Sequence, residues 1–340
     1  MIPYSQHTIT PSDRALVGKS LYGNLTRGNN VQAFEKAICR YTGASYCVSC
    51  SSGTDALWLA YGAVGVRHAI VPSITFNATA NMVESHGGLV RFADCNHFGL
   101  MKLPERMNMD PTLVPVHMNG NSCDMHTIAA SGSRIVEDAC HAFGARYNDN
   151  MVGCCEFSDA CCFSFHPAKT ITTGEGGCVT TNDKDLYEHM LALRNQGFRP
   201  GTHEQICHGR NCHLTEMQAA MGISQLRHVE AFIEDRQAIA DVYYEGLPDS
   251  VEFLCMSEGS LHLFPIFTER RDEVKEHLAK HGFTTQIHYP ALHLQEYWRS
   301  PVDLPGSVRY SETCLSLPIY PDLKLSDAKK VVKLVKEIVG

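Results

Sequence analysis

The stretch FSFHPAKTITTGEGG, residues 163–177, places one lysine between an apolar run and a glycine-rich turn. A lysine held beside small residues and away from water loses its proton more easily than a surface lysine, and the free amine can attack an aldehyde. Most of the 29 basic residues in this chain are expected to lie in water, so position alone says little about Lys169. Its surroundings in the sequence have to provide the argument.

Helical and strand-like patterns alternate around this lysine over the first two thirds of the chain. An amphipathic run predicts a helix over 53–64. Short apolar runs predict strands at 46–50, 69–73, 88–94, 112–118 and 134–139. Such alternation is typical of an α/β domain with a largely parallel sheet, whose ligands bind at the carboxyl ends of the strands.

The pattern changes to an α+β character near residue 250. Strands are predicted at 253–257, 262–269 and 284–290, a charged helix over 270–281, and an amphipathic helix at the C-terminus. We therefore expect a large domain at 1–230 and a smaller C-terminal domain at 231–340.

Composition narrows the class of protein. The chain has 37 acidic and 29 basic residues, a net charge of -8, and no basic block suited to a nucleic-acid backbone. The first twenty residues lack the pattern of a secretory signal, and no apolar run reaches the ~18 residues of a membrane span. We expect a cytoplasmic enzyme with neither nucleic acid nor membrane as a partner.

The fifteen cysteines are odd in number and include two adjacent pairs, which favours reduced, mostly buried thiols over disulfides. Between residues 203 and 213, three histidines and two cysteines lie close together: His203, Cys207, His208, Cys212 and His213. Their spacing matches no standard zinc motif, so we interpret this segment as a polar loop and predict no metal site, with zinc as the alternative.

The segment around Lys169 resembles the internal-aldimine motif of the DegT/DnrJ/EryC/StrS family of sugar aminotransferases. Other stretches resemble landmarks of the same family in the same order: LTRGNNVQAFEKAICRYTGA, SSGTDAL, PSITFNATANM, PVHMNG, VEDACHAFGA and GRNCHLTEMQAAMGISQL. The resemblance implies an aspartate-aminotransferase-like fold, with a mainly parallel seven-stranded sheet in the large domain. It also implies that pyridoxal 5′-phosphate is bound to Lys169 as a Schiff base.

The resemblance assigns roles around the cofactor ring. Asp138 matches the carboxylate that keeps the pyridine nitrogen protonated, which makes the ring an electron sink. His141 stands where many relatives have a glutamine that contacts the ring or its phenolic oxygen. Phe76 matches the aromatic side chain that stacks on the ring.

The resemblance also assigns the phosphate contacts. Gly53 and Thr54 open the 53–64 helix, whose N-terminus offers backbone N–H groups and a positive dipole end. Ser164 matches a side-chain donor to the same phosphate. Asn211 matches an asparagine that comes from a second subunit, which implies a homodimer with shared active sites.

The implied reaction has two halves, with Lys169 as the base that moves the proton. L-Glutamate donates its amino group to the cofactor, and a 4-keto-6-deoxy nucleotide sugar, UDP-linked, accepts it for glycan or surface-polysaccharide synthesis. Thr26, Arg27 and Gly28 resemble a loop that touches the nucleotide sugar, and His288 and Tyr289 resemble a substrate segment. Three sequence segments, CHAFGA, SFHPAKTITTGEGG and QIHYPALH, most resemble those of the subgroup of UDP-4-amino-4,6-dideoxy-N-acetyl-β-L-altrosamine transaminases.

Three alternatives stay open at this point. Two keep the cofactor: amino transfer at carbon 3 of the sugar, and dehydration of a nucleotide sugar. The third is a non-catalytic family member that serves as a binding protein. Related dehydratases carry histidine in place of the lysine, so the presence of Lys169 favours amino transfer.

Overall fold

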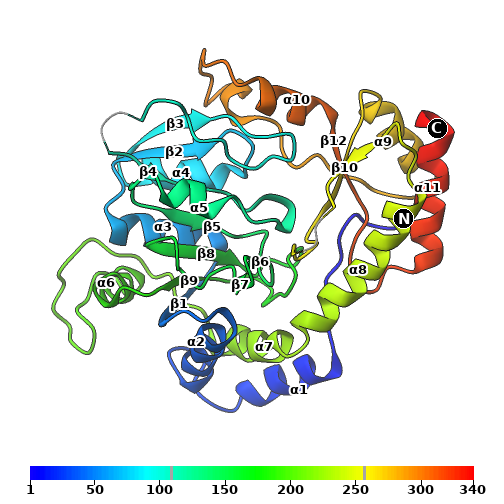
Figure 1. Ribbon diagram of the computed structural model, residues 1–340. Coiled ribbons are helices and arrows are strands. Elements are labelled where there is room, and N and C mark those ends of the chain that lie inside the picture. The colour runs from blue at the N-terminus through cyan, green and yellow to red at the C-terminus, as the bar shows by residue number, and fades with distance from the viewer. Residues whose placement is uncertain (108–109, 256–257) are drawn as a thin grey trace.

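The computed structural model describes residues 1–107, 110–255 and 258–340, and its central element is a twisted sheet (Figure 1). The strands of this sheet are β1 (Tyr46–Cys50), β2 (His68–Pro72), β3 (Leu89–Ala93), β4 (Thr112–Leu113), β5 (Val136–Asp138), β8 (Ala160–Ser164) and β9 (Gly177–Thr181). Their order is β3-β2-β4-β5-β8-β9-β1, where the single bridges Leu113–Ile135 and Val116–Asp138 join β4 to β5. Neighbouring strands are parallel except at β9, which is antiparallel to β8 and β1. The predicted mainly parallel seven-stranded sheet is confirmed.

Helices cover both faces of the sheet. Those of the first two thirds are α1 (Pro11–Ser20), α2 (Asn29–Thr42), α3 (Gly53–Val64), α4 (Asn77–Ser85), α5 (Met125–Ala129), α6 (Lys184–Arg194) and α7 (Glu216–Leu226). Helix α3 packs against β8, β9 and α6, and α2 packs against β1 and α7. Every residue from Ala56 to Tyr61 is at most 2% exposed, because α3 lies in the core between the sheet and its neighbouring helices. A short hairpin of β6 (Arg146–Tyr147) and β7 (Asn150–Met151) lies beside the sheet.

The C-terminal third builds a second core around a small antiparallel sheet. Its elements are α8 (Val229–Gly246), β10 (Glu252–Phe253), β11 (Phe264–Phe267), α9 (Arg271–Lys280), α10 (Pro305–Thr313), β12 (Cys314–Leu317) and α11 (Leu325–Val339). Apolar side chains of α8, α9 and α11 pack on β11 and β12, as expected for an α+β unit. The N-terminal segment joins this unit, since Ile2 bridges to Phe283. The predicted boundary between the two domains, at 230/231, falls inside helix α8. The division of the chain into these two domains stays a prediction.

Three predicted strands differ from the structure. The run 112–118 is a strand only at its start, because Pro115 has no N–H to donate and the chain turns into a 3₁₀ helix at Met118–Gly120. The run 253–257 is paired only at Glu252–Phe253, and residues 256–257 lie outside the described residues. The strand at 284–290 was wrong: Gln286 makes one bridge to Ser316 before Pro290, and His288 and Tyr289 line a cavity.

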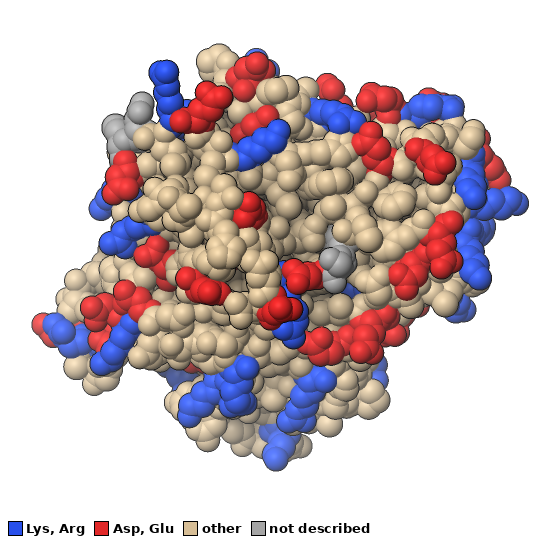
Figure 2. Space-filling view, viewed as in Figure 1, with Lys and Arg blue, Asp and Glu red and all other residues tan. Residues whose placement is uncertain are grey.

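Charged side chains of both signs are interspersed over the face drawn in Figure 2, without a continuous basic surface. Across the described ranges, no helix is long and apolar enough to span a membrane.

Candidate active site

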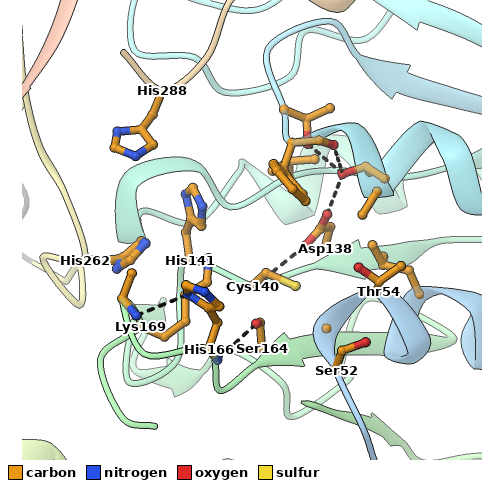
Figure 3. Close-up of a pocket in the computed structure, with 18 of the residues that line it drawn as sticks. Ser52, Thr54, Asp138, Cys140, His141, Ser164, His166, Lys169, His262 and His288 are labelled. Atoms are coloured by element: carbon orange, nitrogen blue, oxygen red, sulfur yellow. Dashed lines mark hydrogen bonds between the residues drawn. The ribbon is translucent and has the colours of Figure 1, made fainter. Parts of the chain in front are cut away.

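A cavity of about 730 Å³ lies at the carboxyl ends of the parallel strands, where the C-terminal unit meets the sheet (Figure 3). Side chains from β1–α3, β2–α4, β5, β8 and the 262–289 region line it. Nine residues predicted for the cofactor or substrate meet there: Gly53, Thr54, Phe76, Asp138, His141, Ser164, Lys169, His288 and Tyr289. Residues far apart in the chain thus form one site.

Lys169 follows β8 in a tight turn, in which its backbone N–H donates to the carbonyl of His166 at 2.9 Å. Its side chain is partly exposed to the cavity, and Nζ makes no hydrogen bond within the described residues. Burial lowers the pKa of Lys169, while the nearby Asp138 acts in the opposite direction. The amine is therefore free to react and loses its proton more readily than a surface lysine.

Asp138 ends β5 with its carboxylate held from two sides. Thr79 Oγ1 donates to one oxygen at 2.7 Å, and the backbone N–H of Cys140 donates to the other at 3.2 Å. The hydroxyl of Thr75 lies 2.7 Å from that of Thr79. The carboxylate is 4% exposed and faces the cavity. It is thus a fixed anion, suited to a protonated ring nitrogen.

A cradle for a phosphate group lies at the N-terminus of α3. Ser52 caps the helix by accepting from the N–H of Asp55 at 3.1 Å, and the N–H groups of Gly53 and Thr54 have no partner among the described residues. A Cβ on Gly53 would come within 2.6 Å of the Cβ of Ser164, so only glycine permits this approach. Free N–H groups, a helix dipole and a serine hydroxyl together fit a phosphate.

Three buried histidines lie on the same side of the pocket as Lys169 in Figure 3. His141 Nε2 is 3.0 Å from the hydroxyl of Tyr289, and His288 Nδ1 is 2.9 Å from that of Ser316. The ring of His262 packs on that of His141, with centroids 4.5 Å apart. Burial lowers the pKa of all three, that of His288 to about 3, so the imidazoles are neutral near pH 7.

Phe76 is the residue before α4 and is 56% exposed, which is unusual for a large apolar side chain. Its ring lies 5.8 Å from that of Tyr289, and both line the cavity. An aromatic face open toward the cavity is suited to stacking on a planar ligand.

Four predicted residues lie outside this cavity in their own chain: Thr26, Arg27, Gly28 and Asn211. Asn211 is exposed and bridges to Asn195. The loop before α2 is fastened to the segment that follows Asn211, because the buried carboxylate of Glu216 accepts the N–H groups of Gly28, Asn30 and Val31. The two predicted contact segments thus lie next to each other.

Two of the residues considered as zinc ligands make other contacts. His213 Nε2 is 3.2 Å from Asn195 Oδ1, and Cys212 Sγ is 3.6 Å from Asp55 Oδ1. No cluster of three or more His, Cys, Asp or Glu side chains that suits a metal ion occurs in the described part of the chain.

Sequence reasoning missed several residues of the site, notably Thr75, Thr79, Glu216 and His262. Thr79 lies in the PSITFNATANM motif three residues after Phe76, so one turn of α4 brings it to Asp138. His262 has no such local signal, since its proximity to His141 arises only in the folded chain.

Known proteins resemble this chain over nearly its full length. Residues 9–336 match the DegT/DnrJ/EryC1/StrS aminotransferase family. A UDP-4-amino-4,6-dideoxy-N-acetyl-β-L-altrosamine transaminase of Campylobacter jejuni is 32% identical, covering 97% of this chain and 96% of the relative. A GDP-perosamine synthase of Escherichia coli O157:H7 is 30% identical, with coverage of 99% and 98%.

Solved structures agree. PseC of Helicobacter pylori, an aminotransferase involved in the biosynthesis of pseudoaminic acid, superimposes with a TM-score of 0.94 at 27% identity and covers 99% of both chains. The aspartate-aminotransferase-like fold and the aminotransferase class expected from the motifs are confirmed. The chain belongs to the DegT/DnrJ/EryC1/StrS aminotransferase family.

Proposed function

We propose that this enzyme uses pyridoxal 5′-phosphate to transfer an amino group from L-glutamate to a 4-keto-6-deoxy nucleotide sugar, UDP-linked, for glycan or surface-polysaccharide synthesis. The observation that carries the proposal is the arrangement in one cavity of the Lys169 amine, the Asp138 carboxylate and the N-terminus of α3. The names of the relatives from Campylobacter jejuni and Escherichia coli support a nucleotide-sugar substrate.

The residues present fit this cofactor. Gly53, Thr54 and Ser164 would hold the phosphate, because their N–H and hydroxyl donors face the same space at the start of α3. A side chain at position 53 would fill this space, since its Cβ would overlap Ser164. Asp138 would face the ring nitrogen, and Phe76 the ring. When bound, pyridoxal phosphate supplies an aldehyde that combines with amines and a ring that accepts the electron pair left when a proton departs from carbon.

Lys169 is proposed to bind the cofactor and to move the proton. Its lowered pKa leaves a larger share of free amine at neutral pH, as an attacking amine and a general base both require. Asp138 would face the ring nitrogen and favour its protonated form, with its carboxylate held in place by the donors from Thr79 and Cys140. The contact between His141 Nε2 and the Tyr289 hydroxyl gives the cavity wall a paired hydrogen-bond donor and acceptor.

A homodimer with shared active sites is part of the proposal. Asn211 and the Thr26–Gly28 loop are on the surface of their own chain, joined through Glu216, and in a dimer they would reach the partner's cavity.

The test is an amino-transfer assay with L-glutamate and a panel of UDP-, GDP- and dTDP-linked 4-keto and 3-keto sugars. We expect the highest kcat/KM with a UDP-linked 4-keto-6-deoxy sugar. Preference for a 3-keto sugar, or loss of water without amino transfer, would contradict the proposed reaction.

A further inference from the structure

The cavity contains few groups that can bind a carboxylate. Among its described lining residues there is no arginine, and the only lysine is Lys169, which the reaction itself uses. The acidic residues of the lining, Asp55, Asp138 and Glu175, repel an anion. An amino-acid donor nevertheless brings at least one carboxylate close to Lys169, so a further positive or proton-donating group is needed there.

His262 is placed to be that group. It lines the cavity, is 3% exposed, and neither of its ring nitrogens makes a hydrogen bond within the described residues, with Nδ1 fully buried. Burying a polar side chain without a partner is costly, and such a group in a native protein calls for an explanation. Figure 3 draws its ring beside Lys169 and His141.

Burial lowers the pKa of His262, and the neighbouring His141, Lys169, Arg236 and His288 lower it further. The Arg236 guanidinium is buried and donates to the carbonyls of Leu261, His262 and Ile319, so it cannot turn toward the cavity without losing these bonds. An incoming carboxylate would reverse the balance, since an anion beside an imidazole favours the charged ring.

We propose that His262 binds a carboxylate of the amino donor and takes up a proton as it does so. This rests on the proposed function, because only a carboxylic amino donor needs such a group. The two substrates then differ in how they bind. The amino donor binds together with a proton taken up by His262, which packs on His141, whereas the nucleotide sugar binds without proton uptake.

The experiment uses the cofactor-loaded enzyme and glutarate, a dicarboxylate without an amino group that binds but cannot react. Its affinity is measured by calorimetry between pH 6.5 and pH 8, in buffers that differ in ionisation heat. For the unaltered enzyme we expect uptake of a proton per glutarate, and tighter binding as the pH falls. The visible cofactor spectrum is recorded in parallel, so that a proton taken up by the cofactor is counted separately.

Two variants test the residue itself. His262→Asn and His262→Gln should each weaken glutarate binding about ten- to hundredfold, as expected for a lost hydrogen bond to a charged group. They should also abolish the additional proton uptake and leave the KM for the nucleotide sugar nearly unchanged. His126→Asn, at an exposed histidine outside the cavity lining, is the matched control and should bind glutarate like the unaltered enzyme.

The outcomes separate the two proposals. If both His262 variants keep the cofactor and bind glutarate as tightly as the unaltered enzyme, with the same pH dependence, the role of His262 is overturned. If the unaltered enzyme does not take up pyridoxal phosphate or aminate any nucleotide sugar, the proposed function itself fails.

Discussion

The carboxylate of Asp138 is oriented by donors from two different elements, Thr79 on α4 and the backbone after β5. The Thr75 hydroxyl lies 2.7 Å from that of Thr79 and extends this hydrogen-bonded group by one more residue. A charge held in this way needs no rearrangement when a positive ring nitrogen faces it, which is the condition for efficient electrostatic stabilisation.

Replacing Asp138 by asparagine keeps the shape of the side chain and removes its charge. We expect Asp138→Asn to lower kcat/KM for amino transfer about 10²–10³-fold while the protein still folds and takes up the cofactor. Thr79→Val removes only one neutral donor and should cost about tenfold or less. Steady-state kinetics of both variants provide the check, and an Asp138→Asn enzyme as active as the unaltered one would show that the charge has no role.

The family resemblance singles out Lys169, Asp138, Ser164 and Gly53, each at a strand end or a helix start, and all four line the cavity. Thr79 lies in one of the family motifs, but its contact with Asp138, 59 residues away, depends on how α4 packs against β5. His262 has no local signal at all, since it meets His141 only in the folded chain. Sequence reasoning of this kind finds residues fixed by local geometry and misses those fixed by packing.

Helix α3 is the element that connects the core to the site. Its apolar middle is buried against the sheet, while its N-terminus opens into the cavity with Gly53 and Thr54. The close approach of Gly53 to Ser164 on β8 sets the position of this N-terminus. The predicted bounds 53–64 agree with the structure, because a cap, a glycine start and the αL residue Gly65 mark both ends clearly.

Adding one methyl group at this position should move the helix end away from β8. We expect Gly53→Ala to lower stability by about 1–3 kcal/mol and to weaken cofactor binding, because the new Cβ overlaps Ser164. Gly18→Ala is the matched control: nothing lies within 4 Å of its added Cβ, so stability should stay the same or rise slightly. Thermal melts and pyridoxal phosphate titrations measure both effects; normal cofactor affinity in Gly53→Ala would rule out the cradle.

The element predicted wrongly, the strand at 284–290, is also instructive. Its alternating pattern resembles a strand, yet only Gln286 pairs with β12, and the chain then brings His288 and Tyr289 into the cavity. Alternating apolar and polar residues indicate which side chains are buried. They do not distinguish a strand paired in a sheet from a segment that lines a binding site.

The site lies where two hydrophobic cores meet, and His141, His262 and His288 are buried there as neutral imidazoles. Neutral burial makes stability depend on pH. The unfolded chain protonates a histidine below about pH 6.5, whereas the folded protein holds the pKa of His288 at about 3. Between these values the unfolded state binds more protons, so stability falls as the pH falls.

The effect of one histidine can be isolated by difference. Between pH 7.5 and pH 5, the unaltered protein should lose about 2 kcal/mol more of its unfolding free energy than His288→Asn, because only the former must exclude a proton from residue 288. Guanidinium unfolding of both proteins at the two pH values gives this number. Equal losses would mean that His288 titrates alike in the folded and unfolded states.

We propose that Lys169 carries pyridoxal phosphate in a site built from the sheet, α3 and the C-terminal unit. The most direct measurement is reduction of the cofactor-loaded protein with borohydride, followed by peptide mass mapping. We predict one covalent phosphopyridoxyl label per chain, on Lys169, and none after Lys169→Ala. A label on another lysine, or no label in a folded protein supplied with excess cofactor, would contradict the account.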